Sequence, residues 1–281
     1  MIRQVALFLA IGLTQLACSY GATEFQIYDQ AFETQYLESA KVMDRLGQAE
    51  RTIVRRLPDR QLVTRDFDPD EAAYVLDVGD PPLTGAVRVS LDALKAYNDA
   101  LSGLVTGDSA AAMAAELGLV SGNLENSINA LTSVTGVALG YGSGLAQAMA
   151  QVLPVFQLAQ TARSRQEFRR QLVAAHPHMR ALLLEMRAGT LQMFAVMRRS
   201  REGRRVLGSG GSSFSAEALQ GLESDRKLLA GWVILLDKTL VTMETAVAAV
   251  EAGAGSAGLS DLLAATVDLK ATAQAIEAAR Q

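Results

Sequence analysis

Cys18 is the only cysteine of the 281-residue chain, so its chemistry depends on the partners that the sequence offers it. A catalytic thiolate needs a base beside it, and the two histidines lie far along the chain, at His176 and His178. An internal disulfide would need a second cysteine, which the sequence lacks. These observations favour Cys18 as an attachment point over Cys18 as a nucleophile.

Other residue types that carry catalysis form no convincing motif. The sequence has no HExxH, GxSxG or P-loop pattern, and its segments GYGSG and GSGGSS follow no predicted strand. We therefore predict no catalytic residue, no cofactor, and a protein that is not an enzyme.

Four aspartates come closest to a metal-binding pattern. They occupy positions 1, 3, 5 and 12 of a calcium-loop spacing, at Asp66, Asp68, Asp70 and Asp77. Glu71 stands where such a loop needs glycine, and Pro69 interrupts it. A simpler interpretation makes Asp68 a helix cap and Pro69 the first helical residue.

His176 and His178 flank Pro177 and have no further ligand nearby in the sequence. This arrangement fits a junction between surface helices better than a metal centre. We predict no metal site in the chain.

Residues 5–17 (VALFLAIGLTQLA) form a short apolar stretch after a basic residue, Arg3. A helix of this length would span about 20 Å, less than the roughly 30 Å hydrocarbon core of a bilayer. A basic start, a short apolar stretch and small residues are typical of a secretory signal peptide. We therefore expect export and removal of residues 1–17.

The end of this stretch, Leu16-Ala17-Cys18, resembles the lipobox of bacterial lipoproteins. The resemblance covers residues 1–18 and departs from the family pattern at Gln15, where the family prefers an aliphatic residue. It implies that Cys18 carries a lipid and anchors the protein in the cell envelope, facing the periplasm. Because Ser19 is not the aspartate associated with inner-membrane retention, the outer membrane is favoured. Ordinary cleavage after Ser19 or Ala22 is the alternative.

The composition favours an all-α fold. Hydrophobic residues make up 49% of the chain, aromatic residues only 5%, and there are six prolines. This mixture suits close-packed helices better than twisted sheets. We expect an elongated up-down bundle of about 6–7 helices in a single domain, 23–281, after a short tether, 18–22. The net charge of −4 argues against binding to nucleic acid.

Hydrophobic periodicity and helix-end signals locate the elements. A capping box, Ser164 with Glu167, predicts a helix that breaks at 175–176 and restarts at Pro177. We expect an irregular acidic and proline-rich segment near 58–87, and flexible loops at 208–215 and 252–258. The other predicted helices cover 23–56, 89–105, about 108–128, 178–202, 216–252 and 260 to the C-terminus.

The helix at 216–252 carries apolar residues in a heptad pattern. Such a stripe is most often the buried face of an intrachain bundle, and self-association through it is the alternative. Its main positions are Leu222, Leu229, Leu236, Met243 and Val250.

The segment 126–162 contains no charged residue. Within it Gly136, Gly140 and Gly144 recur every four residues, which on one helix would form a ridge of small residues that lets a neighbour approach. One interpretation makes the segment a core helix buried on every side, or a turn. The other has it contact or enter a membrane.

Eleven arginines lie between 163 and 205, against three glutamates. The cluster could be a solvated face that balances acids elsewhere, or a contact for anionic lipid, lipopolysaccharide phosphate or cell-wall carboxylates. The densest group consists of Arg198, Arg199, Arg201, Arg204 and Arg205.

Together these features predict a lipid-anchored helical protein of the bacterial envelope with a non-catalytic binding or scaffolding role. Its partners would be the membrane, through the lipid, and an envelope protein, anionic lipid or cell-wall component. Two alternatives stay open: a membrane-active or pore-forming protein that uses 126–162, and an envelope enzyme whose carboxylate site the sequence does not reveal.

Overall fold

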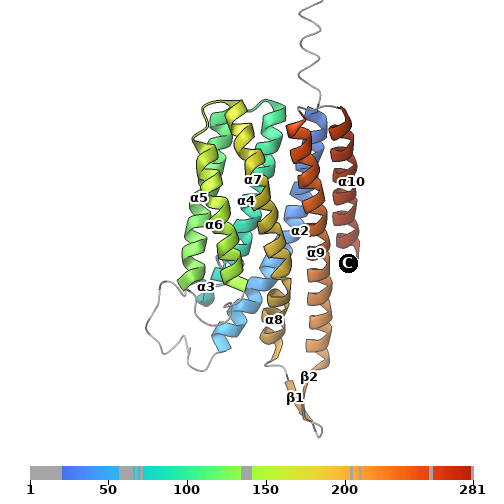
Figure 1. Cartoon of the computed structure of the whole chain (residues 1–281). Helices are drawn as coiled ribbons and strands as arrows, with labels where there is room; N and C mark the ends of the chain where they lie inside the picture. Colours follow the sequence, from blue (N-terminus) through green and yellow to red (C-terminus); the bar gives the residue numbers. More distant parts are fainter. Residues whose placement is uncertain are drawn as a thin grey trace, which may run out of the picture.

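The computed structural model describes residues 21–56, 66, 69, 72–133, 141–202, 205–208, 211–252 and 256–279, which form an all-α bundle (Figure 1). The predicted fold class is confirmed. Residues 1–17, Cys18 and most of the tether lie outside the described residues, so the signal peptide and the lipid anchor stay predictions.

The described residues contain eight helices of twelve or more residues, one short helix and one β-hairpin. In chain order the elements are α2 (Ala22–Arg56), α3 (Ala72–Val75), α4 (Pro82–Thr106), α5 (Ala110–Ser133), α6 (Tyr141–Gln160), α7 (Arg165–Ala188), α8 (Thr190–Arg201), β1 (Arg205–Gly208), β2 (Gly211–Phe214), α9 (Ala216–Glu251) and α10 (Ser256–Ala278).

The long helices run along one common axis (Figure 1). Helices α4, α5, α6 and α7 form one side of the bundle, and α2, α9 and α10 form the other. Helix α8 continues the direction of α7 and lies against α2 and α9. The beginning of α2 and the β-hairpin therefore lie at opposite ends of the molecule.

Helix α9 confirms the predicted seam. Leu229, Leu236, Met243 and Val250 are all buried inside the bundle. The stripe is therefore the buried face of an intrachain bundle, because burying its side chains is what holds an amphipathic helix in place.

Helix α4 begins at Pro82, several residues before the predicted start near 89, so residues 82–87 are not irregular. No side chain at the preceding residue caps it. Instead Glu50, buried on α2, accepts hydrogen bonds from the N–H groups of Leu83 and Thr84, at 3.2 and 3.1 Å. A carboxylate from a distant helix thus satisfies the free amides of the first turn.

The segment before α4 is held by arginines of α2. Arg51 donates to the carbonyl oxygens of Ala73 and Gly79, and Arg55 donates to those of Tyr74 and Val75. These bonds satisfy carbonyl oxygens that belong neither to a sheet nor to a long helix. Within the segment expected to be irregular, residues 72–75 form the short helix α3.

Two of the four aspartates of the calcium-loop pattern, Asp66 and Asp77, are among the described residues. Asp68 and Asp70 lie outside the described residues, and Asp77 pairs with Arg55 at 3.0 Å. Within the part of the chain that the structure describes, no group of three or more His, Cys, Asp and Glu side chains is placed to hold a metal ion.

The Ser164 cap is confirmed, since its side chain accepts from the N–H of Glu167, but the Glu167 carboxylate accepts from the N–H of Arg163 and not from that of Ser164 as in a full capping box. The expected junction at 175–178 is wrong, because α7 continues through Pro177. Proline costs the helix a backbone hydrogen bond, but Pro177 is exposed while its neighbours Ala175 and Met179 pack into the core. Core packing therefore outweighs the local preference.

Other boundaries also differ from the predictions. The helix expected at 178–202 is divided at Gly189 into the end of α7 and α8. Part of the expected loop at 208–215 is strand β2, paired antiparallel with β1. Helix α10 begins at Ser256 rather than Ser260.

Asp225 of α9 joins three helices. Its carboxylate is 3% exposed and accepts two hydrogen bonds each from Arg45 of α2 and Arg201 of α8, the shortest at 2.7 and 2.8 Å. Burial alone would raise the pKa of Asp225, but the bonds from the two guanidinium groups outweigh it and lower the pKa.

Replacing Asp225 with asparagine should lower the free energy of unfolding by about 3 kcal/mol, because two confined arginines lose their common counter-charge. Asp237→Asn is the matched control: Asp237 lies on the same helix and pairs with Arg187, but both side chains are 48% exposed. Urea denaturation of both variants measures the difference. Equal losses would contradict the structural role given to Asp225.

Candidate functional site

The predicted contact residues fall into three groups. Gly136, Gly140 and Arg204 lie outside the described residues, and of Arg205 only the backbone in β1 is described. Gly144 lies in the first turn of α6, and Arg198, Arg199 and Arg201 lie in the last turn of α8. The structure therefore places Gly144 and the α8 arginines on different elements.

Gly144 makes room for a side chain rather than for a helix backbone. A Cβ atom at this position would lie 2.0 Å from an oxygen of Glu185 on α7. Of the three glycines of the expected ridge, only Gly144 is among the described residues, and its neighbour is a carboxylate and not a helix backbone.

Helix α6 is buried on one side only, which corrects the expectation of burial all round. Leu145, Met149 and Phe156 point into the core, whereas Gln147 and Gln151 are exposed. These glutamines form the solvent-facing side of α6, the side that charged residues occupy on most surface helices. Of the helices in the described residues, none is long and apolar enough to cross a bilayer.

Several of the clustered arginines have structural partners. Arg180 and Arg187 pair with Glu244 and Asp237 of α9, and Arg201 pairs with Asp225. The interpretation as a solvated face that balances acids elsewhere fits Arg180 and Arg187, whose pairs are about half exposed, whereas the pair of Arg201 with Asp225 lies inside the bundle. Arg198 and Arg199 are exposed and have no carboxylate partner among the described residues.

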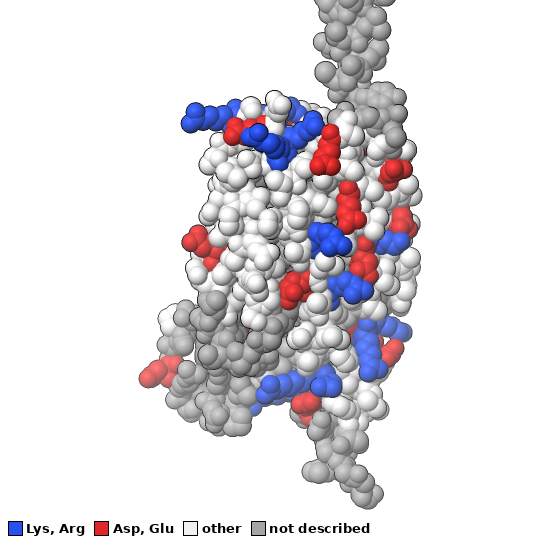
Figure 2. Space-filling model, viewed as in Figure 1, with Lys and Arg blue, Asp and Glu red and all other residues white. Residues whose placement is uncertain are grey.

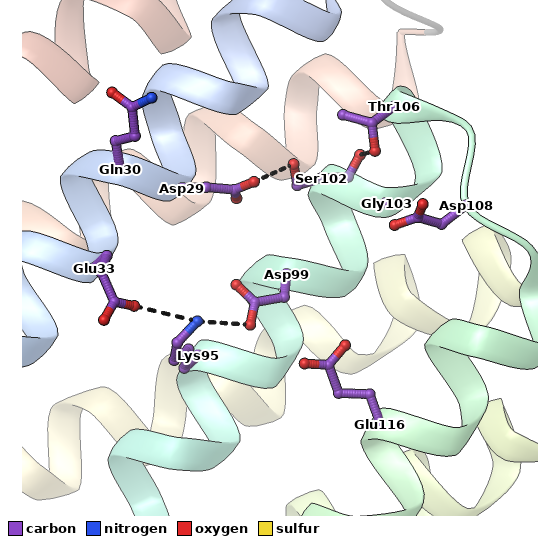
Figure 3. Close-up of a pocket in the computed structure, with 10 residues that line it drawn as sticks. All are labelled: Asp29, Gln30, Glu33, Lys95, Asp99, Ser102, Gly103, Thr106, Asp108 and Glu116. Atoms are coloured by element: carbon purple, nitrogen blue, oxygen red, sulfur yellow. Dashed lines mark hydrogen bonds and ion pairs between the residues drawn. The ribbon is translucent and has the colours of Figure 1, made fainter.

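A cleft between α2, α4 and α5 is the candidate site, with a cavity of about 400 Å³ (Figure 3). Its lining combines five carboxylates with one ammonium group and several small polar residues. The side chains are Asp29, Gln30, Glu33, Lys95, Asp99, Ser102, Gly103, Thr106, Asp108 and Glu116.

Helices α2 and α4 and the turn after α4 contribute most of these residues, and α5 contributes Glu116. Asp29 and Glu33 are one turn apart on α2, and Lys95, Asp99 and Ser102 follow one another along α4. The turn after α4 contributes Asp108: Gly107 adopts a φ of 106°, which favours glycine. Gly103 leaves room there, because a Cβ atom on it would lie 2.8 Å from a carboxylate oxygen of Asp108.

The charges in the cleft are unequal. Lys95 lies between Glu33 and Asp99, at 3.4 and 2.9 Å from their carboxylates (Figure 3). One ammonium therefore serves two acids, while Asp29, Asp108 and Glu116 have no cation paired with them among the described residues. The cleft carries an excess of negative charge.

Asp29 is the most perturbed group in the cleft. One oxygen accepts a hydrogen bond from Ser102 at 2.7 Å, and the other is buried without a hydrogen-bond partner among the described residues. Burial, together with the negative charges of Asp99 and Asp108, raises the pKa of Asp29 to about 6, although the hydrogen bond from Ser102 lowers it. Burial likewise raises the pKa of Glu116.

The arrangement suits a positively charged ligand. A cation that entered the cleft would meet unpaired carboxylates and would offer a donor to the free oxygen of Asp29. A buried acceptor left without a donor is unfavourable, so such a ligand would gain free energy by supplying one.

Sequence reasoning missed the cleft because its residues lie on three separate helices. The only local signals are two pairs four residues apart, Asp29 with Glu33 and Lys95 with Asp99, and such pairs are common on solvent-exposed helix faces. No spacing in the sequence shows that the two helices face each other here.

Comparison with known proteins adds no relative: no family model, curated protein or solved structure matches the chain. The function proposed for this protein therefore rests on the residues of this chain alone.

Asp29→Asn should stabilise the fold by about 1 kcal/mol at pH 7.5, after allowance for solvent screening. The folded-state pKa of about 6 lies above the usual value of about 3.9, so the contribution of Asp29 to stability is greatest below pH 4 and is lost as the pH rises from about 4 through 6. Asparagine removes that loss and can still accept from Ser102.

Thermal unfolding of both proteins at pH 7.5 and pH 4 measures the effect. The variant should melt higher at pH 7.5, and the difference should disappear at pH 4. A variant that is less stable at both values would show that Asp29 has a structural partner instead.

Proposed function

We propose that this protein is a lipid-anchored, non-catalytic binding protein of the bacterial cell envelope, and that its acidic cleft takes a cationic group of a ligand. The lipobox-like residues before Cys18 support the anchor. The observation that carries the binding site is the buried, unpartnered oxygen of Asp29 in a cleft whose acids outnumber its one cation.

The position of the cleft agrees with an envelope ligand held near the membrane. Asp29 lies within two turns of the start of α2, about 10 Å along its axis from Ala22. Only Ser19 to Gly21 would separate the lipid on Cys18 from α2, and three residues reach at most about 10 Å. A ligand in the cleft would thus lie close to the anchoring bilayer.

A cavity of about 400 Å³ fits a small organic cation or the end of a longer one. Amines and guanidinium groups can donate to several carboxylates at once. A polyamine or a lysine- or arginine-bearing chain is therefore the ligand class that we propose, and spermidine is a suitable probe.

The anchor is tested by metabolic labelling with palmitate. The wild-type protein should incorporate label, and Cys18→Ser should not, because acylation requires the thiol. Label that persists in the Cys18→Ser protein would contradict the anchor, as would a mature N-terminus mapped to Tyr20 or Thr23.

The binding site is tested by spermidine titration calorimetry with two variants of α5. Glu116→Gln removes a carboxylate that lines the cleft and should weaken binding about two- to fivefold, whereas Glu125→Gln, on the same helix but outside the cleft, should change nothing. Binding should also weaken between pH 7.5 and pH 5 as Asp29 takes up a proton. Identical affinities in both variants would refute the site.

Acid–base catalysis in the same cleft is the second candidate. The favouring observation is the pKa of Asp29, about 6, which lies where a carboxyl group can both donate and accept a proton near neutral pH. A spermidine analogue or peptide that is turned over, with loss of turnover in Asp29→Asn, would favour catalysis over binding.

A further inference from the structure

Charges on the surface of the bundle are largely balanced by their neighbours. Figure 2 shows Lys and Arg side chains beside Asp and Glu side chains over α7 and α9, where ion pairs such as Arg180–Glu244 join the two helices. A buried charge without a close counter-charge is more unfavourable than an exposed one. Arg51 of α2 is the one arginine that is buried among the described residues, with a side chain that is 9% exposed.

Arg51 uses two of its three guanidinium nitrogens within the chain. Nε and Nη2 donate to the carbonyl oxygens of Ala73 and Gly79, whereas Nη1 has no hydrogen-bond partner among the described residues. The carboxylate that pairs with Arg51 is that of Asp77, whose Oδ1 atom lies 3.9 Å from Nε and already accepts from Arg55 at 3.0 Å. One shared and exposed acid therefore balances the buried charge incompletely.

Arg51 lies in the wall of a second cavity, of about 800 Å³, between α2 and the segment that precedes α4. Gly47 lines the same cavity one turn earlier on α2, and a Cβ atom on it would lie 3.5 Å from Nη1 of Arg51. The absence of a side chain at Gly47 leaves Nη1 open on this side. The cavity shares no lining residue with the acidic cleft.

The lining of this cavity holds as many cations as acids. Arg88 pairs with Asp80 and, at 3.2 Å, with Asp44. Arg55 pairs with Asp77 at 3.0 Å. Together with the buried arginine, the lining thus has three arginines and three aspartates. A dianion such as phosphate would meet three carboxylates and a single unengaged guanidinium nitrogen, so this lining disfavours it.

Two groups of opposite character are unengaged at the cavity. Nη1 of Arg51 is a donor that suits a carboxylate. Oδ2 of Asp77 accepts no hydrogen bond within the described part of the chain, and it suits an ammonium group. The two side chains approach to 3.9 Å, so a ligand that met both would need its own opposite charges close together.

We propose that this cavity binds a free α-amino acid, with its carboxylate on Arg51 and its ammonium group on Asp77. An α-amino acid bears both charges on one carbon atom, which matches the short separation of the two protein groups. A peptide holds its terminal charges further apart. A cavity of about 800 Å³ leaves room for the side chain of the ligand. The proposal adds a second site and does not rest on the function proposed for the acidic cleft.

The test is thermal unfolding and calorimetry of the full purified protein in detergent, with each standard L-amino acid at millimolar concentration. At least one amino acid should bind and raise the Tm. Its amide derivative, which lacks the carboxylate, and its N-acetyl derivative, which lacks the ammonium group, should each bind about tenfold more weakly. Inorganic phosphate should not displace it, and its affinity should be the same with and without spermidine in the acidic cleft.

Asp77→Asn should weaken binding of that amino acid about fivefold, because the ammonium group loses its counter-charge at an exposed carboxylate. The matched control is Asp268→Asn on α10. Asp268 is also exposed and ion-paired, with Lys238 at 2.5 Å, but it does not line the cavity, so the control should bind as the wild type does.

Gly47→Ala separates binding from folding. Alanine favours a helix more than glycine does, and a Cβ atom fits at 3.5 Å from its neighbours, so the free variant should have a higher Tm. The same methyl group stands beside Nη1 of Arg51 and should weaken binding of the amino acid. A loss of affinity in a more stable protein cannot come from unfolding.

Four results would overturn the proposal. The first is failure of every amino acid to bind, and the second is an equal loss of affinity in Asp77→Asn and Asp268→Asn. The third is displacement by phosphate, because the cavity would then take an anion alone, or by spermidine, because the amino acid would then lie in the acidic cleft. The fourth is an unchanged affinity in Gly47→Ala, which would exclude Nη1 of Arg51 as the partner of the carboxylate.

Discussion

The fold depends most directly on a single buried carboxylate. Asp225 receives both guanidinium groups that point at it from α2 and α8, so three helices meet at one charge. Helix α8 is only twelve residues long and packs mainly on α2 and α9. Met193, Val196 and Met197 pack α8 into the core, and the ion pairs of Asp225 hold its last turn against α2 and α9. Gly221 contributes, because a Cβ atom there would lie 2.0 Å from the Arg201 guanidinium.

Glu50 is a second buried carboxylate that joins two helices, here α2 and the beginning of α4. It is buried, and burial raises its pKa, yet two backbone amides and two hydroxyl groups converge on it. In both cases a buried acid on a long helix accepts hydrogen bonds from donors of another helix: backbone N–H groups of α4 for Glu50, and the Arg201 guanidinium of α8 for Asp225. The partners lie far apart in the sequence, which is why local signals placed the start of α4 near residue 89. Ser90 lies inside the helix, where its hydroxyl donates to the carbonyl oxygen of Ala86.

The sequence was most informative where a helix is defined by its own residues. The apolar periodicity of α2 and α9 and the Ser164 cap gave these elements nearly to the residue. It was least informative where distant partners decide the outcome. Pro177 would end an isolated helix, but packing of Ala175 and Met179 carries α7 through it. The cleft was not predicted either, since it depends on how α2 and α4 are placed, which no motif encodes.

Asp29 and Asp225 show how one residue type acquires opposite properties. Asp225 is more buried, but two guanidinium groups lower its pKa, whereas Asp29 has a single hydroxyl donor and its pKa is raised. The fully buried acids among the described residues, Glu38, Glu50 and Asp225, all have donors. Among the described residues, Asp29 is the acid with a buried carboxylate oxygen that has no hydrogen-bond partner, and it lies beside a cavity large enough for a ligand. Donors within the chain satisfy the other three acids, so Asp29 is the one for which a partner from outside the chain would supply the missing donor.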